Sequence, residues 1–275
     1  MNTGKITVLT LVLGGFLTVT CSVKEDRMQC PCFLTEDFSR VELPVEGSVP
    51  WISLLDDTGR AVAQHPIHPD MMRSGPSYVA RVPKDDIGVA VLYGIVHYSV
   101  SSRPDVLELG SGFEADSLYG HCARVDCRRE TASDTVRLYK QWCTLELKLE
   151  GSESWKPYYF EIHGNWNGIN LRDFSAAPGP LCCIPRKTGP VTFEVRLPRQ
   201  GDASLSLQVY ETDGFGMPSE LRYEYPLGKL LEHRGYDWKR KGLDDALVTI
   251  DYAKADVQVE IAPWDDGQDY HDITI

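Results

Sequence analysis

Short runs of alternating apolar and polar residues recur along most of the chain, and clusters of turn-forming residues separate them. A period of two is typical of strands that bury one face, whereas an amphipathic helix needs a period near 3.6. For example, the apolar run at 50–55 ends in Asp56, Asp57, Thr58 and Gly59, residue types that favour a turn. The pattern predicts a mostly β protein with strands over 50–55, 78–82, 89–98, 137–149, 158–163, 192–197, 204–210, 246–252 and 257–264.

One short motif occurs twice. The segment 81–84 (Arg-Val-Pro-Lys) matches 196–199 (Arg-Leu-Pro-Arg) at an offset of 115 residues, and a strand-like run follows each copy. A repeat of domain size suggests two β-sandwiches of similar plan in tandem. We therefore predict an N-terminal β-sandwich domain over 33–134 and a C-terminal one over 135–275. The stretch 99–134 is rich in Gly, Ser, Asp and Arg without a sustained period, so we expect a long connection between the halves.

The N-terminal segment has the pattern of a secretory signal. An apolar run at 6–20 follows one basic residue, Lys5, and is shorter than the roughly 20 apolar residues of a membrane-spanning helix. Small residues precede Cys21, as in the cleavage site of bacterial lipoproteins, although Thr18 and Thr20 depart from its usual form. We predict a signal peptide over 1–20, a lipidated linker over 21–32, and acyl chains such as palmitate on Cys21 that form a stable anchor. The alternative is an ordinary signal peptide cut near Thr20.

The charge balance argues against one class of partner. The chain has 28 Lys+Arg against 40 Asp+Glu, a net charge of −12, and its longest basic patch is the short run 239–241. Binding to nucleic acid depends on neutralising phosphates, so we predict no nucleic-acid partner. Hydrophobic residues make up 42% of the chain, which is enough for a buried core.

The cysteines leave several possibilities open. Without Cys21 seven cysteines remain, an odd number that cannot all pair within one chain. Pairing of Cys122 with Cys127, or of Cys30 with another loop cysteine, is possible in an oxidising compartment. A metal centre would use Cys30, Cys32, His121, Cys122 and Cys127, but their spacing does not match a paired zinc knuckle, so we predict no metal site.

No motif of an enzyme is present. The sequence contains neither Gly-x-Ser-x-Gly nor a phosphate-binding Gly-x4-Gly-Lys motif, and we predict a protein without catalytic residues or cofactors. The tryptophans can be interpreted either as a sugar-binding platform or as core residues, and the second role is the commoner one in a sandwich. They are Trp155, Trp166, Trp238 and Trp264.

Several motifs in a fixed order resemble a known family. They are Cys21 followed by 24–27 (Lys-Glu-Asp-Arg) and 30–32 (Cys-Pro-Cys), then 138–141 (Leu-Tyr-Lys-Gln), 164–169, 225–228 (Tyr-Pro-Leu-Gly), 235–238 (Gly-Tyr-Asp-Trp) and the strand 257–264. From Cys21 almost to Ile275 the chain resembles the fimbrillin-A-associated anchor proteins of type V fimbriae. Its additional cysteines from Cys122 onward and its relaxed lipoprotein motif depart from that pattern.

The resemblance implies an all-β fold of two tandem transthyretin-like β-sandwich domains. It also implies a lipid-tethered minor subunit, exposed on the outer membrane, that anchors a fimbria and limits its length. Such subunits join fimbrillin, the major subunit, by β-strand addition. We hypothesise that the polymerising strand includes Val257, Val259, Ile261 and Trp264; alternatively, this segment is the last strand of its own sandwich.

A second function class is a surface lipoprotein that binds a glycan or a host protein, as an adhesin or tip subunit. It would use exposed aromatic side chains such as Trp155, Tyr158 and Trp166.

Overall fold

The computed structural model describes residues 30–41, 49–73, 75–151, 158–213, 215–251 and 256–264. Within these ranges the regular structure consists of strands, one short α-helix and one 3₁₀ turn, so the predicted all-β sandwich fold is confirmed. The predicted signal peptide, Cys21, Trp155 and the tail after Trp264 lie outside the described residues.

The first half of the chain builds two sheets. Its elements are β1 (Cys32–Asp37), β2 (Trp51–Leu55), β3 (Ala61–Pro66), η2 (Pro69–Met71), β4 (Met72–Arg73), β5 (Ser77–Val82), β6 (Asp86–Tyr93), β7 (Tyr98–Val100), β8 (Val106–Leu109), β9 (Tyr119–Asp126), β10 (Thr131–Thr135) and β11 (Tyr139–Lys140). One sheet has the order β10-β1-β5-β4 and the other β11-β9-β6-β2-β3. Apolar residues from both, such as Leu34 of β1 and Val89 of β6, pack together in one buried cluster. We call these two sheets the N-terminal sandwich.

The second half builds two further sheets. Its elements are β12 (Trp142–Glu150), β13 (Tyr158–Asn170), β14 (Ala176–Cys183), β15 (Arg186–Lys187), β16 (Thr192–Pro198), β17 (Ser206–Thr212), β18 (Pro218–Tyr225), α1 (Leu227–His233), β19 (Asp245–Asp251) and β20 (Asp256–Ala262). One sheet has the order β15-β16-β12-β19-β20; in the other, β18-β17-β13 continues to β8 and β7, and β14 also pairs with β13. We call these sheets the C-terminal sandwich.

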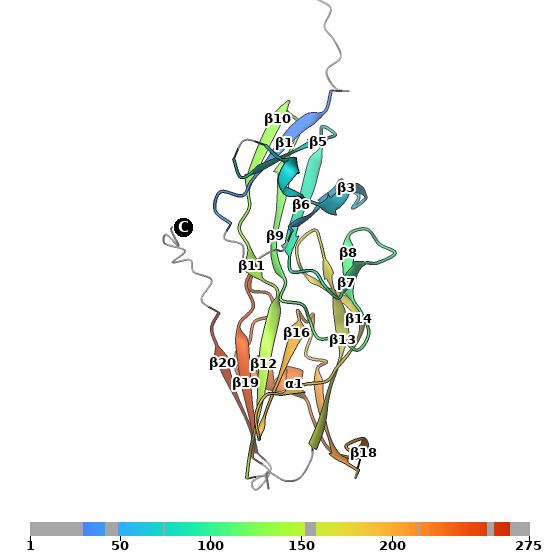
Figure 1. Cartoon of the computed structure of the whole chain (residues 1–275), viewed down its shortest axis with the longest axis vertical. Coiled ribbons are helices and arrows are strands. Elements are labelled where there is room, and N and C mark those ends of the chain that lie inside the picture. The colour runs from blue at the N-terminus through green and yellow to red at the C-terminus, as the bar shows by residue number, and fades with distance from the viewer. Residues whose placement is uncertain are drawn as a thin grey trace, which may run out of the picture.

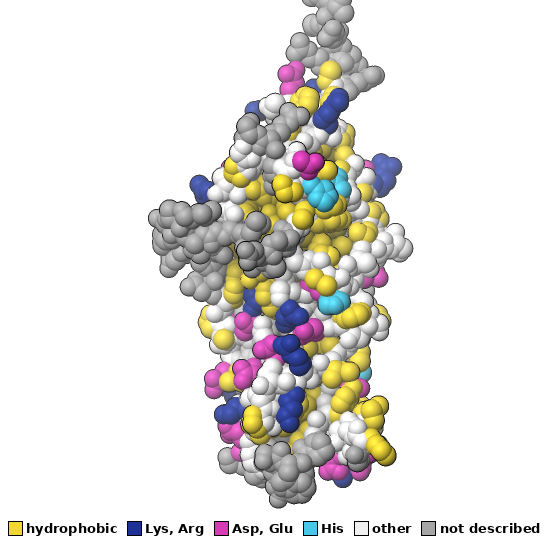
Figure 2. Space-filling model, viewed as in Figure 1, with side chains coloured by type: hydrophobic (Ala, Val, Ile, Leu, Met, Phe, Trp, Pro, Cys, Tyr) yellow, Lys and Arg dark blue, Asp and Glu magenta, His cyan; other side chains and the backbone are white. Residues whose placement is uncertain are grey.

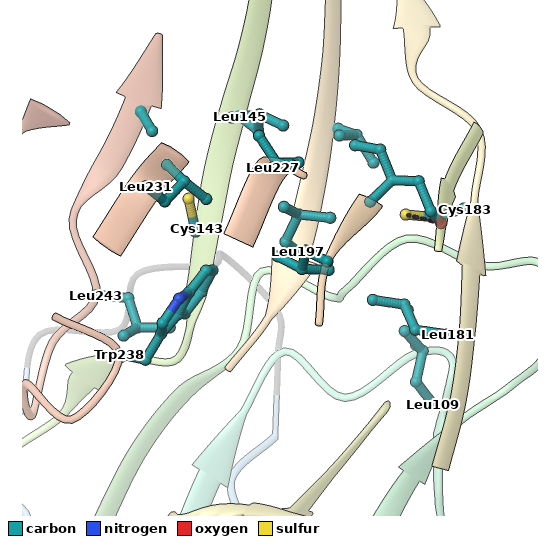
Figure 3. Close-up of a cluster of buried hydrophobic side chains, with 14 of the residues drawn as sticks. Leu109, Cys143, Leu145, Leu181, Cys183, Leu197, Leu227, Leu231, Trp238 and Leu243 are labelled. Atoms are coloured by element: carbon teal, nitrogen blue, oxygen red, sulfur yellow. Dashed lines mark hydrogen bonds between the residues drawn. The ribbon is translucent and has the colours of Figure 1, made fainter. Parts of the chain in front are cut away.

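The core of the C-terminal sandwich lies between its sheets and is closed by α1. Leu145 of β12, Leu197 of β16 and Leu231 of α1 point into it, as Figure 3 shows, and all three are fully buried. The inward side chains occupy alternate positions of β12, where Cys143, Leu145, Leu147 and Leu149 are buried. This alternation is the physical origin of the pattern seen in the sequence.

The two sandwiches repeat one strand plan. In the N-terminal sandwich β1 pairs antiparallel with β5 and parallel with β10; in the C-terminal one β12 pairs antiparallel with β16 and parallel with β19. The sequence motif at 81–84 and 196–199 falls at the ends of the equivalent strands β5 and β16. Even the register agrees, because Cys32 lies opposite Val82 and Cys143 lies opposite Leu197. The short sequence echo therefore marks a structural repeat.

The expectation of a long irregular connection over 99–134 is wrong. This stretch contains β8, β9 and β10 and part of β7, and β9 is a long strand paired with β6. In addition, β8 pairs with β13, so β7 and β8 join the C-terminal sandwich although they precede residue 134. Glycine and charged residues interrupt the alternation of apolar and polar positions in this stretch. Its strands are also defined by pairing with β6 and β13, which are distant along the chain, so the local pattern does not predict them.

The two sandwiches are stacked along the long axis of the molecule (Figure 1). The chain passes from β11, which pairs with β9, directly into β12 of the C-terminal sandwich. Arg196 forms an ion pair with Glu114 at 2.6 Å, and its carbonyl accepts a hydrogen bond from the Ala115 amide at 2.9 Å. These contacts fix the junction between the two sandwiches.

The described part of the chain contains no helix with the length and apolar character needed to cross a membrane.

Candidate functional site

The hypothesised polymerising segment forms the outer strand of a sheet. β20 pairs antiparallel with β19 over its whole length, and among the described residues its other edge has no strand beside it. Val259 is buried in the C-terminal core, and Val257 and Ile261 pack against that core. These three residues alternate, so they share the inward face of β20. The strand thus belongs to its own sandwich through its inward side chains and forms the open edge of the sheet.

Trp264 follows β20 and does not continue the alternation. Its backbone N–H donates a hydrogen bond to Asp244 Oδ1 at 2.8 Å, and its ring lies against Gly242, where a Cβ atom would clash with it. Arg240 donates to the same Asp244 carboxylate. These contacts tie the end of β20 to the loop before β19.

Among the described residues, β20 has no counterpart in the N-terminal sandwich. The equivalent of β19 there is β10, which lies at the edge of its sheet, because the chain continues into β11 on the opposite sheet. An edge strand presents unpaired N–H and C=O groups that a further strand can bind. The edges of β10 and β20 are therefore candidate positions for strand addition.

A further open edge, that of β18, carries exposed apolar side chains. β18 is the last strand of its sheet, and Phe215 at the tip of the β17–β18 hairpin is 94% exposed. Met217, Leu221 and Tyr223 are also exposed. The sequence analysis missed β18; the alternation of Leu221, Tyr223 and Tyr225 with charged residues was the available signal.

A cavity of about 280 Å³ lies at the junction of the two sandwiches. Its lining comes from β9, from the β11 segment and from the loop at 239–241. Its basic lining residues are Arg137, Arg199, Lys239, Arg240 and Lys241, whereas Asp173 is its only acidic one. In a chain with a net charge of −12, this concentration of positive charge suits an anionic group.

Arg199 holds one wall of this cavity. It is buried, and its guanidinium donates hydrogen bonds to the carbonyls of Arg240 at 2.7 Å and Lys241 at 3.1 Å and to Gln141 Oε1 at 3.0 Å. Burial lowers the pKa of this guanidinium. Its Nε atom is buried without a hydrogen-bond partner among the described residues.

None of the described cysteines forms a disulfide. The pairing of Cys122 with Cys127 suggested by the sequence is incompatible with the fold. Cys122 lies within β9 and Cys127 directly follows it, so extended chain separates them by far more than the 7 Å limit for bridged Cα atoms. Instead, the thiols of Cys32 and Cys127 are neighbours inside the N-terminal core.

Among the described residues, the aromatic side chains of the alternative hypothesis do not form an open platform. The indole nitrogen of Trp166 is buried, and its ring lies against Gly201. Tyr158 packs against the C-terminal core, and Trp238 is buried. Trp155 lies outside the described residues.

Comparison with known proteins rests on structure alone. No protein-family model matches the chain, and no curated protein matches it by sequence. Among solved structures, the fimbrial anchor protein Mfa2 from Porphyromonas gingivalis matches with a TM-score of 0.60 and 11% identity, over 86% of this chain and 98% of that one. The chain shares the fold of this anchor protein.

Two further structures have the same fold. A candidate polysaccharide-binding protein from Bacteroides thetaiotaomicron matches with a TM-score of 0.59 and 12% identity, over 85% of this chain and 96% of that one. A candidate adhesin from Bacteroides ovatus matches with a TM-score of 0.56 and 14% identity, over 85% of this chain and 94% of that one. At these identities the likeness establishes the fold and leaves the function to be argued from the chain itself.

Proposed function

We propose that the protein is a lipid-tethered minor subunit that anchors a fimbria to the bacterial outer membrane and limits its length. The observation that carries the proposal is the fold shared with a fimbrial anchor protein over 98% of that protein's chain. The order of motifs from Cys21 to the last strand supports the same role. We place the protein on the cell surface, as part of the fimbrium.

Acyl chains on Cys21 would supply the attachment. At about 0.8 kcal/mol for each buried CH₂, two or more chains hold a protein stably on a bilayer without a membrane-spanning segment. A subunit whose N-terminus is fixed in lipid can terminate a polymer, because that end is not free for further addition. This single chemical feature accounts for both anchoring and length control.

Strand addition would join the protein to fimbrillin. The open edges of β20 and β10 provide main-chain donors and acceptors, and alternate side chains set the register. In this proposal Val257, Val259 and Ile261 are the residues of β20 that specify its position. If β20 itself is donated to a partner, its inward side chains must leave their own core, and the partner groove must replace that burial.

The test replaces Cys21→Ala in the native host, with Cys30→Ser as the matched control at an exposed cysteine. We expect Cys21→Ala to release fimbriae into the medium or to lengthen them, as seen by cell fractionation and electron microscopy, and Cys30→Ser to leave them unchanged. If Cys21→Ala merely makes the protein soluble and the cells retain normal fimbriae, the protein is not the anchor.

The second candidate function is a surface lipoprotein that binds an acidic glycan or a host protein. The basic cavity at the junction of the sandwiches favours it, since carboxylate and sulfate groups of acidic sugars complement such a lining. This function predicts that the isolated protein binds an acidic polysaccharide and that Lys239→Glu together with Lys241→Glu weakens binding. The anchor function predicts capture of fimbrillin and no binding of sugar.

A further inference from the structure

Three potential metal ligands converge on the outer surface of the C-terminal sandwich. They are Glu161 and His163 of β13 and Cys182 of β14, and their ligand atoms all lie within 4.8 Å of one another. The described ranges contain no second group of this kind. The sequence analysis assigned no metal site, because these residues are distant along the chain and match no zinc motif.

The strand pairing explains why the three side chains meet. Phe160 and Ile162 point into the core, so Glu161 and His163 project from the opposite face of β13. Cys182 lies directly opposite His163 across the β13–β14 pair. Its neighbours Leu181 and Cys183 point inward, as Figure 3 shows, so Cys182 faces outward beside His163.

The spacing of the three groups suits one ion. His163 Nε2 lies 2.9 Å from Glu161 Oε2. Zinc–nitrogen and zinc–oxygen bonds are about 2.0–2.2 Å and zinc–sulfur bonds about 2.3 Å, so ligand atoms in a tetrahedral site are roughly 3.5 Å apart. Small side-chain rotations bring the three atoms to such distances, and the site is open to solvent because the side chains of His163 and Glu161 are 38% and 22% exposed.

The combination of ligands indicates which metal. An imidazole nitrogen, a thiolate sulfur and a carboxylate oxygen together suit zinc, whereas calcium and magnesium select sites made of oxygen alone. We propose that Glu161, His163 and Cys182 bind a zinc ion whose fourth ligand is water. Binding exchanges the thiol proton of Cys182 for the metal and releases that proton to solvent, so no oxidant or reductant is needed.

Two tyrosines orient the site. Tyr159 and Tyr210 face each other across the β13–β17 pair, and both hydroxyl groups lie near the Glu161 carboxylate. Gln208 accepts a hydrogen bond from Tyr210 at 2.7 Å. Such groups around a metal ligand fix its orientation and typically change metal affinity about 10–100-fold.

The experiment titrates the full chain with zinc chloride in a metal-free buffer that contains a non-thiol reductant. Calorimetry measures stoichiometry and affinity, and cobalt(II) reports thiolate coordination through its charge-transfer absorption. The test variants are Glu161→Gln, His163→Gln, Cys182→Ser and Tyr159→Phe. Cys30→Ser and His68→Gln are the matched controls, because both residues are exposed elsewhere on the protein.

We expect one zinc ion per chain, at least tenfold weaker binding for each of the three ligand variants, and unchanged binding for the controls. Tyr159→Phe should weaken binding without removing the cobalt–thiolate band. Thermal unfolding of each metal-free variant, compared with the metal-free parent, checks that the fold persists. Absence of stoichiometric zinc binding, or equal binding by Cys182→Ser and the parent, would overturn the proposal.

Discussion

Glu36 of β1 lies opposite Asp134 of β10 in the parallel strand pair at the edge of the N-terminal sandwich, so two carboxyl groups face each other. Glu36 is fully buried, and neither of its carboxyl oxygens has a hydrogen-bond partner in the described part of the chain. Burial, reinforced by the charge of Asp134, raises the pKa of Glu36 to about 8. At neutral pH the folded protein therefore holds a proton on Glu36 that the unfolded chain releases.

This proton makes stability depend on pH. Because the folded-state pKa is the higher one, the contribution of Glu36 is most favourable below about pH 4.5 and is lost as the pH rises toward about 8. Replacing Glu36→Gln should remove this dependence. Between these limits, the free energy of unfolding of the variant minus that of the parent should increase by up to about 1.4 kcal/mol for each pH unit. Chemical denaturation at a series of pH values measures the difference, with the exposed Glu260→Gln as the control. Parallel stability curves for the parent and Glu36→Gln would contradict the assignment.

A buried ion pair links the segment between the sandwiches to β19. The Lys140 side chain is 4% exposed and its ammonium group donates to Asp245 Oδ1, whereas the Asp245 side chain is 37% exposed. We expect Asp245→Ala to destabilise the protein by about 3 kcal/mol, because it leaves a buried ammonium unpaired. Lys140→Met should cost less, since the carboxylate that remains can be hydrated and still accepts a hydrogen bond from the Thr144 amide.

The surface pair Arg222–Glu211 is the control for that prediction. Both side chains are about 40% exposed, and surface pairs contribute about 1 kcal/mol or less. Denaturant titration of Arg222→Ala should therefore show a much smaller change than Asp245→Ala. Equal losses of unfolding free energy for the two variants would mean that water can reach the Lys140 ammonium once Asp245 is removed.

Cys32 and Cys127 are the pair expected to form a disulfide under oxidising conditions. Both are fully buried in the N-terminal core, and burial together with the neighbouring Cys32 thiol raises the pKa of Cys127 to about 12. When the N-terminal core opens transiently, a small-molecule disulfide would join β1 to the end of β9 by thiol–disulfide exchange, with the oxidant reduced to thiols. Mass spectrometry of the digested protein should identify a disulfide-linked Cys32–Cys127 peptide pair. Thermal unfolding should show a higher unfolding temperature for the oxidised protein than for the reduced one.

The other buried thiols provide the comparison. Burial raises the pKa of Cys143 and of Cys183 to about 12, as it does for Cys127, so all three thiols should resist alkylation in the folded state, whereas the exposed Cys30 should be alkylated quickly. Cys127 differs in having a second buried thiol, that of Cys32, beside it. A disulfide that joins any other pair of described cysteines would show that the thiols of Cys32 and Cys127 do not meet in solution.

Val259 tests where β20 belongs in the isolated protein. It is 5% exposed and packs in the C-terminal core, so Val259→Asp should destabilise the monomer by about 3 kcal/mol or more, while Glu260→Gln on the outward face should have almost no effect. Thermal unfolding of the purified monomer measures both. If Val259→Asp left the monomer unchanged but abolished its assembly with fimbrillin, β20 would act only as a donated strand.

The surface is charged over much of its lower half, where acidic and basic side chains lie interspersed on the face shown in Figure 2. This distribution is consistent with a chain that has 25% charged residues and no long run of one sign.

The alternation of apolar and polar residues in the sequence was enough to predict the strands that bury one face. The alternation at 192–197 and 246–252 predicted β16 and β19, because period-two burial is a property of each strand alone. The echo of 81–84 at 196–199 located equivalent strands of a structural repeat, since the same register recurs where β5 and β16 end. β18 escaped detection because most of it is exposed on both faces.

Relations between distant segments were decided by tertiary structure alone. The sequence assigned β7 and β8 to a connection, yet hydrogen bonds to β13 place them in the C-terminal sandwich. The contact of Cys32 with Cys127 and the meeting of His163 with Cys182 likewise depend on which strands pair and in which register. Which strands pair depends on burying whole sheet faces, and the loops between paired strands can be long. Composition and period therefore identify a strand and its buried face but do not identify the strand beside it.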